Sequence, residues 1–162
     1  MSATDEYLVN NETYAQSFGG PLALPPARRL AVVACMDARL NIYALLGLRD
    51  GDAHVIRNAG GVVTQDTIRS LVISQRLLGT RRIMLIHHTD CGMLTFTDDD
   101  FKREIEKEEG IRPHWAPEAF TDLEDDVRQS VRRIQVDPFV THTDAIRGFV
   151  FNVKSGLLKE VK

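Results

Sequence analysis

Two short segments of the chain contain residue types that could bind one metal ion together. Cys35 opens the segment CMDAR at residues 35–39, and His88 and Cys91 belong to the segment HTDCG at residues 88–92. Two thiolates and one imidazole form a good donor set for zinc, and three protein ligands leave a fourth position open, as in catalytic zinc sites. The two segments therefore predict a catalytic zinc site that consists of Cys35, His88 and Cys91.

The chain contains only two cysteines, and two simpler interpretations of Cys35 and Cys91 compete with the metal site. A disulfide between them is disfavoured in a reducing compartment. Buried cysteines can also pack as small hydrophobic side chains without a chemical role. The metal site is favoured because both cysteines follow apolar runs and a histidine precedes Cys91 at His-x-x-Cys spacing.

Both segments directly follow apolar runs that are typical of buried strands. The run LAVVA at residues 30–34 precedes Cys35, and the run IMLI at residues 83–86 precedes the histidine pair. Continuous apolar runs of this kind indicate strands of a parallel sheet that is covered on both faces. Because open α/β sheets place their ligands at the carboxyl ends of strands, we expect the two segments to meet there.

The remaining pattern predicts an α/β fold with a central, mainly parallel β-sheet flanked by helices. Strand and helix signals alternate through the first half of the chain, as expected for parallel strands joined by crossover helices. The C-terminal residues predict a β-hairpin at the sheet edge, with a glycine turn at residues 154–156. The expected helices are residues 5–18, 40–46, 64–78, 98–109 and 121–136, and the expected strands are residues 30–34, 53–57, 82–87, 149–153 and 157–161. Gly47, Thr64 and Thr121 are candidate helix caps.

Length and composition are those of an ordinary globular protein. The 162 residues are 43% hydrophobic and 27% charged, which predicts a single domain over residues 1–162 with an N-terminal arm at residues 1–26. The net charge is −3 and the arginine pairs are isolated, so the basic stripe that nucleic-acid binding requires is missing. No apolar run reaches the length of a membrane span, and residues 1–20 lack the pattern of a secretory signal. We therefore expect a cytoplasmic protein that binds neither nucleic acid nor membrane.

The two metal-binding segments together resemble the β-class carbonic anhydrases. That family is similar in its Cys-x-Asp-x-Arg segment, its downstream His-x-x-Cys-Gly segment and a turn that corresponds to Arg57-Asn58-Ala59-Gly60. The resemblance extends from the first strand to the last hairpin. It implies zinc ligands at Cys35, His88 and Cys91 and one zinc ion per subunit.

The resemblance also implies that Asp37 and Arg39 are the family's catalytic dyad. A guanidinium presents a fork of donors that matches a carboxylate, so Arg39 could hold Asp37 beside the metal. Asp37 could then orient the reacting water, or it could bind zinc as a fourth ligand and close the site. The sequence is compatible with both states. The alternative is a surface ion pair worth under about 1 kcal/mol.

The reaction implied by the resemblance is the reversible hydration of carbon dioxide to bicarbonate by zinc-bound hydroxide. A branch of short family members hydrolyses carbonyl sulfide to hydrogen sulfide and carbon dioxide, and residues 35–39, 57–61 and 87–89 are also similar to that branch. A non-catalytic zinc-binding module or a redox thiol protein is a third possibility. Family members usually form dimers or tetramers with the pocket at the subunit interface, so a homodimer or homotetramer is expected.

Several further residues are candidates for the surroundings of the metal. The predicted substrate pocket and its supporting shell comprise Arg57, Asn58, Ala59, Gly60, Gly61 and Gly92. His87 is expected to be a core or supporting histidine, because only His88 has the His-x-x-Cys spacing. Asp90 either supports the ligands or is simply solvated. The other histidines, His54, His114 and His142, could shuttle protons, but ordinary surface or loop positions are the preferred interpretation.

Overall fold

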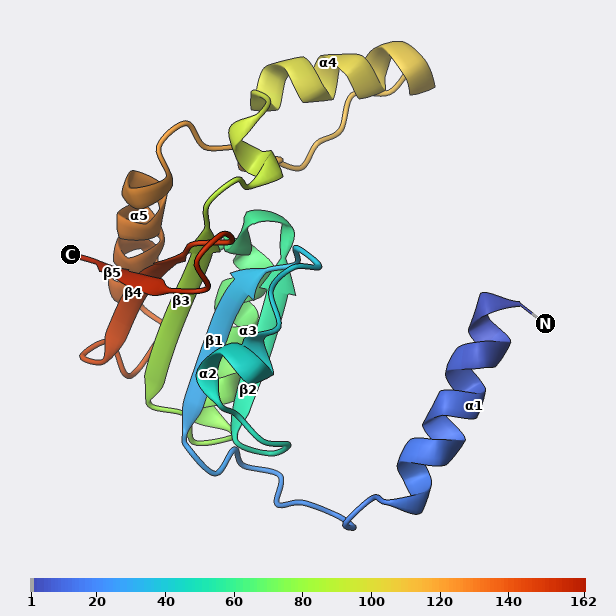
Figure 1. Cartoon of the computed structure of the whole chain (residues 1–162). Coiled ribbons are helices and arrows are strands. Elements are labelled where there is room, and N and C mark those ends of the chain that lie inside the picture. Colours follow the sequence, from blue (N-terminus) through green and yellow to red (C-terminus); the bar gives the residue numbers. More distant parts are fainter. Residues whose placement is uncertain (1) are drawn as a thin grey trace.

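The computed structural model describes residues 2–162 and has a five-stranded sheet with the strand order β2-β1-β3-β4-β5 (Figure 1). The strands are β1 (Leu30–Cys35), β2 (Ala53–Asn58), β3 (Arg82–His88), β4 (Ile146–Phe151) and β5 (Leu158–Val161). The helices are α1 (Ala3–Gln16), α2 (Ile42–Leu46), α3 (Gln65–Arg76), α4 (Asp98–Glu109) and α5 (Leu123–Gln135), with single 3-10 turns η1 (Ala59–Gly61) and η2 (Gly92–Leu94). The predicted α/β fold with a mainly parallel sheet is confirmed.

The sheet brings the two predicted metal-binding segments to the same end. β1 pairs in parallel with β2 on one side and β3 on the other, so that Ala34 lies between Arg57 and Ile86. Both β1 and β3 end one or two residues later, and the segments that follow them therefore lie side by side. β4 continues the parallel pairing and β5 is antiparallel to β4, which confirms the C-terminal hairpin. The prediction missed the first residues of β4, which begins at Ile146.

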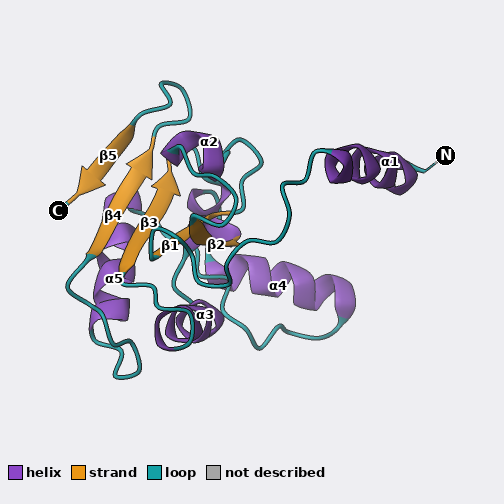
Figure 2. Cartoon of the chain, turned by 90° about the horizontal axis from the view of Figure 1, so that it is seen from below, coloured by secondary structure: helices purple, strands orange, loops and turns teal. Residues whose placement is uncertain are grey.

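Helices cover the two faces of the sheet unequally, as Figure 2 shows from below. The long helices α3 and α5 lie on one face, while the short helix α2 is the only helix of residues 2–162 that lies on the other. Alternate residues of β1 and β3 serve the two resulting cores, with Val33 and Leu85 on the α3 side and Val32 and Ile86 on the opposite side. All four side chains are fully buried, as expected for central strands of a covered parallel sheet.

The helix ends agree with most of the capping predictions. The Thr64 side chain accepts a hydrogen bond from the backbone N–H of Thr67 at the start of α3, and Gly47 ends α2 in the left-handed conformation. The predicted cap at Thr121 is wrong, because α5 begins one residue later and the side chain of Asp122 accepts from the N–H of Asp125. Aspartate satisfies a free N–H at a helix start and also carries the favourable negative charge.

Helix α1 and helix α4 project away from the sheet (Figures 1 and 2). α1 has no buried residue, and its contact with the body includes a hydrogen bond of 3.2 Å from the Tyr14 hydroxyl to Asp50. Large apolar side chains are nevertheless exposed along the arm: Tyr7, Leu8, Val9, Tyr14, Phe18, Leu22 and Leu24. Within residues 2–162, the helices are too short or too polar to span a bilayer.

Gly61 allows η1 to pack directly on the backbone of β1. Its φ is +69°, and a Cβ at this position would lie 2.7 Å from the backbone nitrogen of Cys35 and 2.9 Å from the carbonyl carbon of Ala34. Neither backbone atom can move without disturbing the central strand. The close approach therefore requires glycine.

We predict that Gly61→Ala lowers the free energy of unfolding by about 2–5 kcal/mol, since left-handed strain and overpacking add together. Gly79→Ala is the matched control, because Gly79 also has a positive φ of +74° but has no atom within 4 Å of the added Cβ. The control should lose only about 1–2 kcal/mol. Urea denaturation measures the free energy of unfolding of both variants. Equal losses in the two would contradict the argument that a Cβ at Gly61 collides with the backbone of β1.

Candidate metal centre

The side chains of Cys35, His88 and Cys91 converge at the carboxyl ends of β1 and β3. Their potential ligand atoms, two sulfurs and one ring nitrogen, all lie within 4.8 Å of one another. All three residues are buried, and both cysteines are free thiols. The structure thus brings together the three residues that the sequence predicted, and it does not contain the alternative disulfide.

The imidazole of His88 has the tautomer that metal binding requires. Its Nδ1 atom lies 2.9 Å from the carbonyl oxygen of Thr89, which can only accept, so Nδ1 carries the proton. The Nε2 atom therefore has a free lone pair. Among the residues that the structure describes, this atom is one of the few buried polar side-chain atoms without a hydrogen-bond partner. A buried lone pair next to two thiols fits a soft divalent cation such as zinc.

Backbone N–H groups surround the two sulfur atoms and favour their ionised forms. The amides of Asp37 and Gly60 donate to the Cys35 sulfur, and the amide of Met93 donates to Cys91. Donation from the Cys91 thiol is the largest cause that lowers the pKa of Cys35. The same contact and burial raise the pKa of Cys91, because a second thiolate beside the first is unfavourable. A divalent cation bound by both sulfurs would remove that penalty.

Asp37 lies beside the three residues and is held by Arg39. The Asp37 Oδ1 atom accepts from the backbone N–H of Arg39 at 2.9 Å and from its Nε at 3.0 Å, and Oδ2 accepts from Nη2 at 2.8 Å. These bonds hold the pKa of the Asp37 carboxyl well below its usual range. The Oδ2 atom also lies 3.6 Å from Nε2 of His88, so the carboxylate faces the predicted metal position.

Arg39 also links the two metal-binding segments to each other. Its Nη1 donates to Oδ2 of Asp90 at 2.7 Å, and its Nη2 donates to the Asp90 carbonyl at 2.9 Å. Asp90 adopts a left-handed φ of +57°, which turns its carbonyl toward the guanidinium. We call this set of contacts the Asp37–Arg39–Asp90 bridge. It resolves the two interpretations of Asp90 in favour of a supporting residue.

Residues of the predicted turn after β2 support the segment after β1. Arg57 donates from Nε to the Cys35 carbonyl at 2.9 Å and from Nη2 to the Asp37 carbonyl at 2.7 Å. Asn58 donates from Nδ2 to the Val62 carbonyl at 2.8 Å and to the Thr67 hydroxyl at 3.2 Å, which fixes the turn itself. Both side chains therefore support the metal site indirectly, because they hold the backbone of the segment after β1 and of the turn after β2.

A cavity of about 350 Å³ opens next to the cysteines and Asp37. Of the six residues expected in the pocket or its supporting shell, Ala59, Gly60 and Gly92 line the cavity, whereas Arg57, Asn58 and Gly61 do not. Its remaining lining residues are Met36, Met93, Thr95 and Phe96. Apart from Asp37, the thiols and one threonine, the walls are apolar, which suits a small uncharged substrate.

The matching family model is described as carbonic anhydrase and covers residues 30–158. The β-carbonic anhydrase 1 of Mycobacterium tuberculosis is 65% identical over 161 residues, which is 99% of each chain. This chain belongs to the β-carbonic anhydrase family.

Solved structures of the family have the same fold. The carbonic anhydrase of Streptococcus mutans is 40% identical, with a TM-score of 0.93 over 100% of this chain and 99% of that chain. A carbon disulfide hydrolase from Saccharolobus solfataricus is 45% identical over 96 residues, which cover 59% of this chain and 46% of that protein. The family therefore includes relatives named for two different substrates.

The other histidines of this β-carbonic anhydrase family member lie outside the cavity. His87 is fully buried on the opposite face of β3 and lies 2.7 Å from Oδ2 of Asp126, which agrees with the expected supporting role. His54 lies 2.7 Å from the hydroxyl of Ser74, His142 bonds to Gln75 through its backbone, and His114 is exposed. The pairing of His87 with Asp126 was not predicted, since 39 residues separate them and no spacing rule relates them.

We predict that the purified protein contains one zinc ion per chain and that His88→Ala and Cys35→Ser lose it, because each removes one of only three donors. His114→Ala, at an exposed position outside the cluster, should keep full zinc content. Metal analysis measures the zinc, and a thiol reagent should react faster with both cysteines after chelation. Full zinc in His88→Ala would contradict the assignment.

Proposed function

We propose that the protein is a zinc-dependent carbonic anhydrase that reversibly hydrates carbon dioxide to bicarbonate. The observation that supports this most strongly is the position of Asp37, which faces Nε2 of His88 at 3.6 Å while Arg39 donates to both carboxylate oxygens. A purely structural zinc site has four protein ligands and no need for an oriented carboxylate. Membership of the family supports the same activity.

Cys35, His88 and Cys91 are the proposed zinc ligands. Zinc bound there would supply a Lewis acid that lowers the pKa of a coordinated water. Two thiolates donate more negative charge than imidazoles would, so a neighbouring base is useful. Asp37 is ionised at neutral pH, because Arg39 keeps the pKa of its carboxyl low. It would accept a hydrogen bond from the reacting water.

We infer that Arg39 keeps Asp37 in the open state rather than as a fourth zinc ligand. Both Asp37 oxygens are engaged by the guanidinium, and rotation of the carboxylate onto the metal would break those charge-assisted bonds. Asp90 secures the other side of the same guanidinium. The bridge therefore orients the base and leaves the fourth position for water.

The cavity walls position a substrate that has no charge. Met93 and Phe96 present apolar side chains next to the cysteines, while the missing side chains of Gly60 and Gly92 leave space between them. Carbon dioxide is small, linear and apolar, so it partitions into such a site without a desolvation cost. Bicarbonate is charged, and the apolar walls favour its departure.

Hydrolysis of a sulfur-containing heterocumulene by the same site is the second candidate. The relatives named carbon disulfide hydrolase favour it, including one from Acidithiobacillus thiooxidans that is 31% identical over 159 residues. Attack on the central carbon is the same chemistry for carbon dioxide, carbonyl sulfide and carbon disulfide. The size and polarity of the cavity distinguish them.

We propose further that the protein acts as a homodimer or homotetramer in which α1 packs on a neighbouring subunit. The helix buries none of its residues within one chain, although Tyr7, Leu8 and Phe18 are each more than half exposed. Exposed apolar surface of this extent on an extended arm is typical of a subunit contact.

The proposed activity is tested by assaying carbon dioxide hydration and carbonyl sulfide hydrolysis side by side on the zinc-loaded protein. We expect faster hydration, and Asp37→Asn should reduce it because the amide lacks the negative charge that pairs with Arg39 and would orient the reacting water. Efficient carbonyl sulfide loss with feeble hydration would support the second candidate. Turnover of neither substrate would refute both.

We predict that Arg39→Lys lowers kcat/KM by about tenfold to a hundredfold, since an ammonium cannot bond both Asp37 oxygens and Asp90 together and the base becomes misplaced. Arg69→Lys is the control, because Arg69 forms an exposed ion pair of 2.8 Å with Asp66 on α3, away from the cavity. An equal loss in both variants would argue against the bridge.

We predict that removal of residues 2–18 reduces the mass measured by sedimentation from an oligomer to a smaller species, because the apolar arm surface is lost. The double variant Tyr7→Ser and Leu8→Ser should act in the same direction without shortening the chain. A full-length protein that sediments as a monomer would rule out this role for α1.

A further inference from the structure

A buried phenylalanine supports the apolar wall of the cavity from behind. Phe120 is 7% exposed and is not a lining residue, but its backbone N–H donates to the carbonyl of the lining residue Met93 at 3.2 Å. A Cβ at Gly60 would lie 2.9 Å from Met93 Cγ and 3.2 Å from Phe120 Cε1. Gly60, Met93 and Phe120 are therefore packed against one another, and of the three only Phe120 does not line the cavity.

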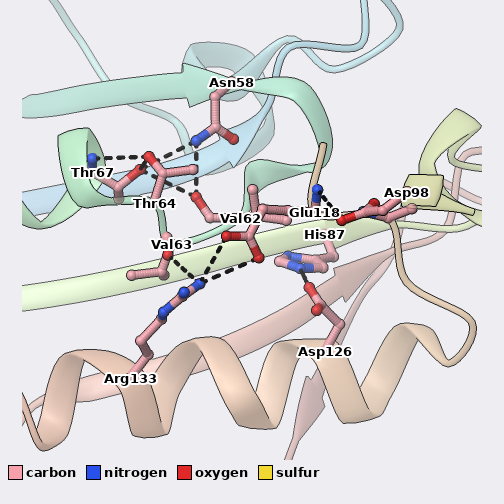
Figure 3. A network of polar contacts seen from close by, with 11 residues as sticks. Asn58, Val62, Val63, Thr64, Thr67, His87, Asp98, Glu118, Asp126 and Arg133 are labelled. Atoms are coloured by element: carbon pink, nitrogen blue, oxygen red, sulfur yellow. Dashed lines mark hydrogen bonds and ion pairs between the residues drawn. The ribbon is translucent and has the colours of Figure 1, made fainter. Parts of the chain in front are cut away.

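His87 restrains the Phe120 ring on its other side. The two rings have centroids 5.5 Å apart and planes inclined by 34°. His87 cannot move away, because it is fully buried and its Nε2 lies 2.7 Å from Oδ2 of Asp126 on α5 (Figure 3). The order from α5 to the cavity is therefore Asp126, His87, Phe120 and Met93.

The segment that contains Phe120 is anchored at its start. Asp98 accepts from the backbone N–H groups of Glu118 at 3.2 Å and Ala119 at 2.7 Å (Figure 3). The Glu118 carboxylate lies 3.4 Å from Nη1 of Arg133, which also donates to the Val63 carbonyl at 2.8 Å. Glu118 has a left-handed φ of +63°, a conformation that persists only where the surroundings determine it. Phe120 thus has a fixed position relative to both α5 and the turn after β2.

We propose that Phe120 is a positioning residue that sets the width of the substrate cavity and so favours oxygen-containing over sulfur-containing heterocumulenes. Met93 is an unbranched and adaptable side chain, and it can define a narrow wall only while something rigid supports it. Phe120 supplies that support. The inference rests on the proposed function, because it concerns which linear molecule reaches the same metal-adjacent position.

The test uses two linear anions, cyanate and thiocyanate. Thiocyanate carries a sulfur where cyanate carries an oxygen, which is also the difference between carbonyl sulfide and carbon dioxide. Each is titrated into the cobalt-substituted protein, whose visible absorption reports binding at the metal without turnover. In Phe120→Ala, Met93 can retreat into the vacated space, so the ratio of thiocyanate to cyanate affinity should rise about tenfold, the scale of one methylene in an apolar pocket. Phe120→Leu should raise it less. The ratio of kcat/KM for carbonyl sulfide to that for carbon dioxide should shift in the same direction.

Leu71→Ala is the matched control, because Leu71 is also fully buried but belongs to the core cluster on the α3 side of the sheet. It should leave both ratios unchanged while lowering stability. Unchanged ratios in both Phe120 variants, or an equal shift in Leu71→Ala, would overturn the inference while leaving the proposed function intact. A zinc-loaded wild type that turns over neither substrate would overturn the proposed function and this inference with it.

Discussion

Parallel pairing of β1 with β3 is the constraint on which the site depends. Cys35 and His88 are 53 positions apart in the sequence (88 − 35), and they meet because both strands run in the same direction and end at the same level. The pairing depends in turn on two buried cores, since Val33 and Leu85 face α3 while Val32 and Ile86 face the opposite side. A slip of β3 by one residue in this register would turn His88 away from Cys35 and exchange the two faces of β3.

At the ends of these two strands, backbone groups shape the site, and the side chain of Arg39 joins the segment after β1 to the segment after β3. The contact between the two cysteine side chains has the largest effect on their ionisation, and the backbone amides of Asp37, Gly60 and Met93 add a smaller stabilisation of the thiolates. Arg39 then connects the segment after β1 to the segment after β3 through Asp37 and Asp90. A bidentate guanidinium suits this role because its geometry is fixed before it binds. The same residue thus keeps the base ionised and keeps the two segments at a constant separation.

Much of this arrangement could be predicted from the sequence, because the relevant signals are local. The apolar runs before Cys35 and His88 identify two buried strands, and the ligand types identify the metal. The caps at Thr64 and Gly47 follow from residue preferences within one turn. The cap prediction at Thr121 was wrong, since the next residue, Asp122, is also of a type that caps helices and α5 begins directly after it.

The contacts that the sequence could not reveal are those between distant segments. Asp126 is paired with His87 only because α5 lies on the back of β3, and Phe120 reaches Met93 only through a loop anchored by Asp98. Neither contact has a characteristic spacing. Likewise, the alternatives for Asp90 were resolved by the position of the Arg39 guanidinium, which depends on the separation of two strand ends.

The central claim is that one zinc ion is bound by two sulfurs and one imidazole at the ends of β1 and β3. X-ray absorption spectroscopy at the zinc edge of the fully loaded protein tests it most directly. The account predicts two sulfur neighbours at about 2.3 Å together with nitrogen or oxygen neighbours at about 2.0–2.1 Å. A shell of four sulfurs, or one without sulfur, would contradict the Cys35–His88–Cys91 site and the chemistry derived from it.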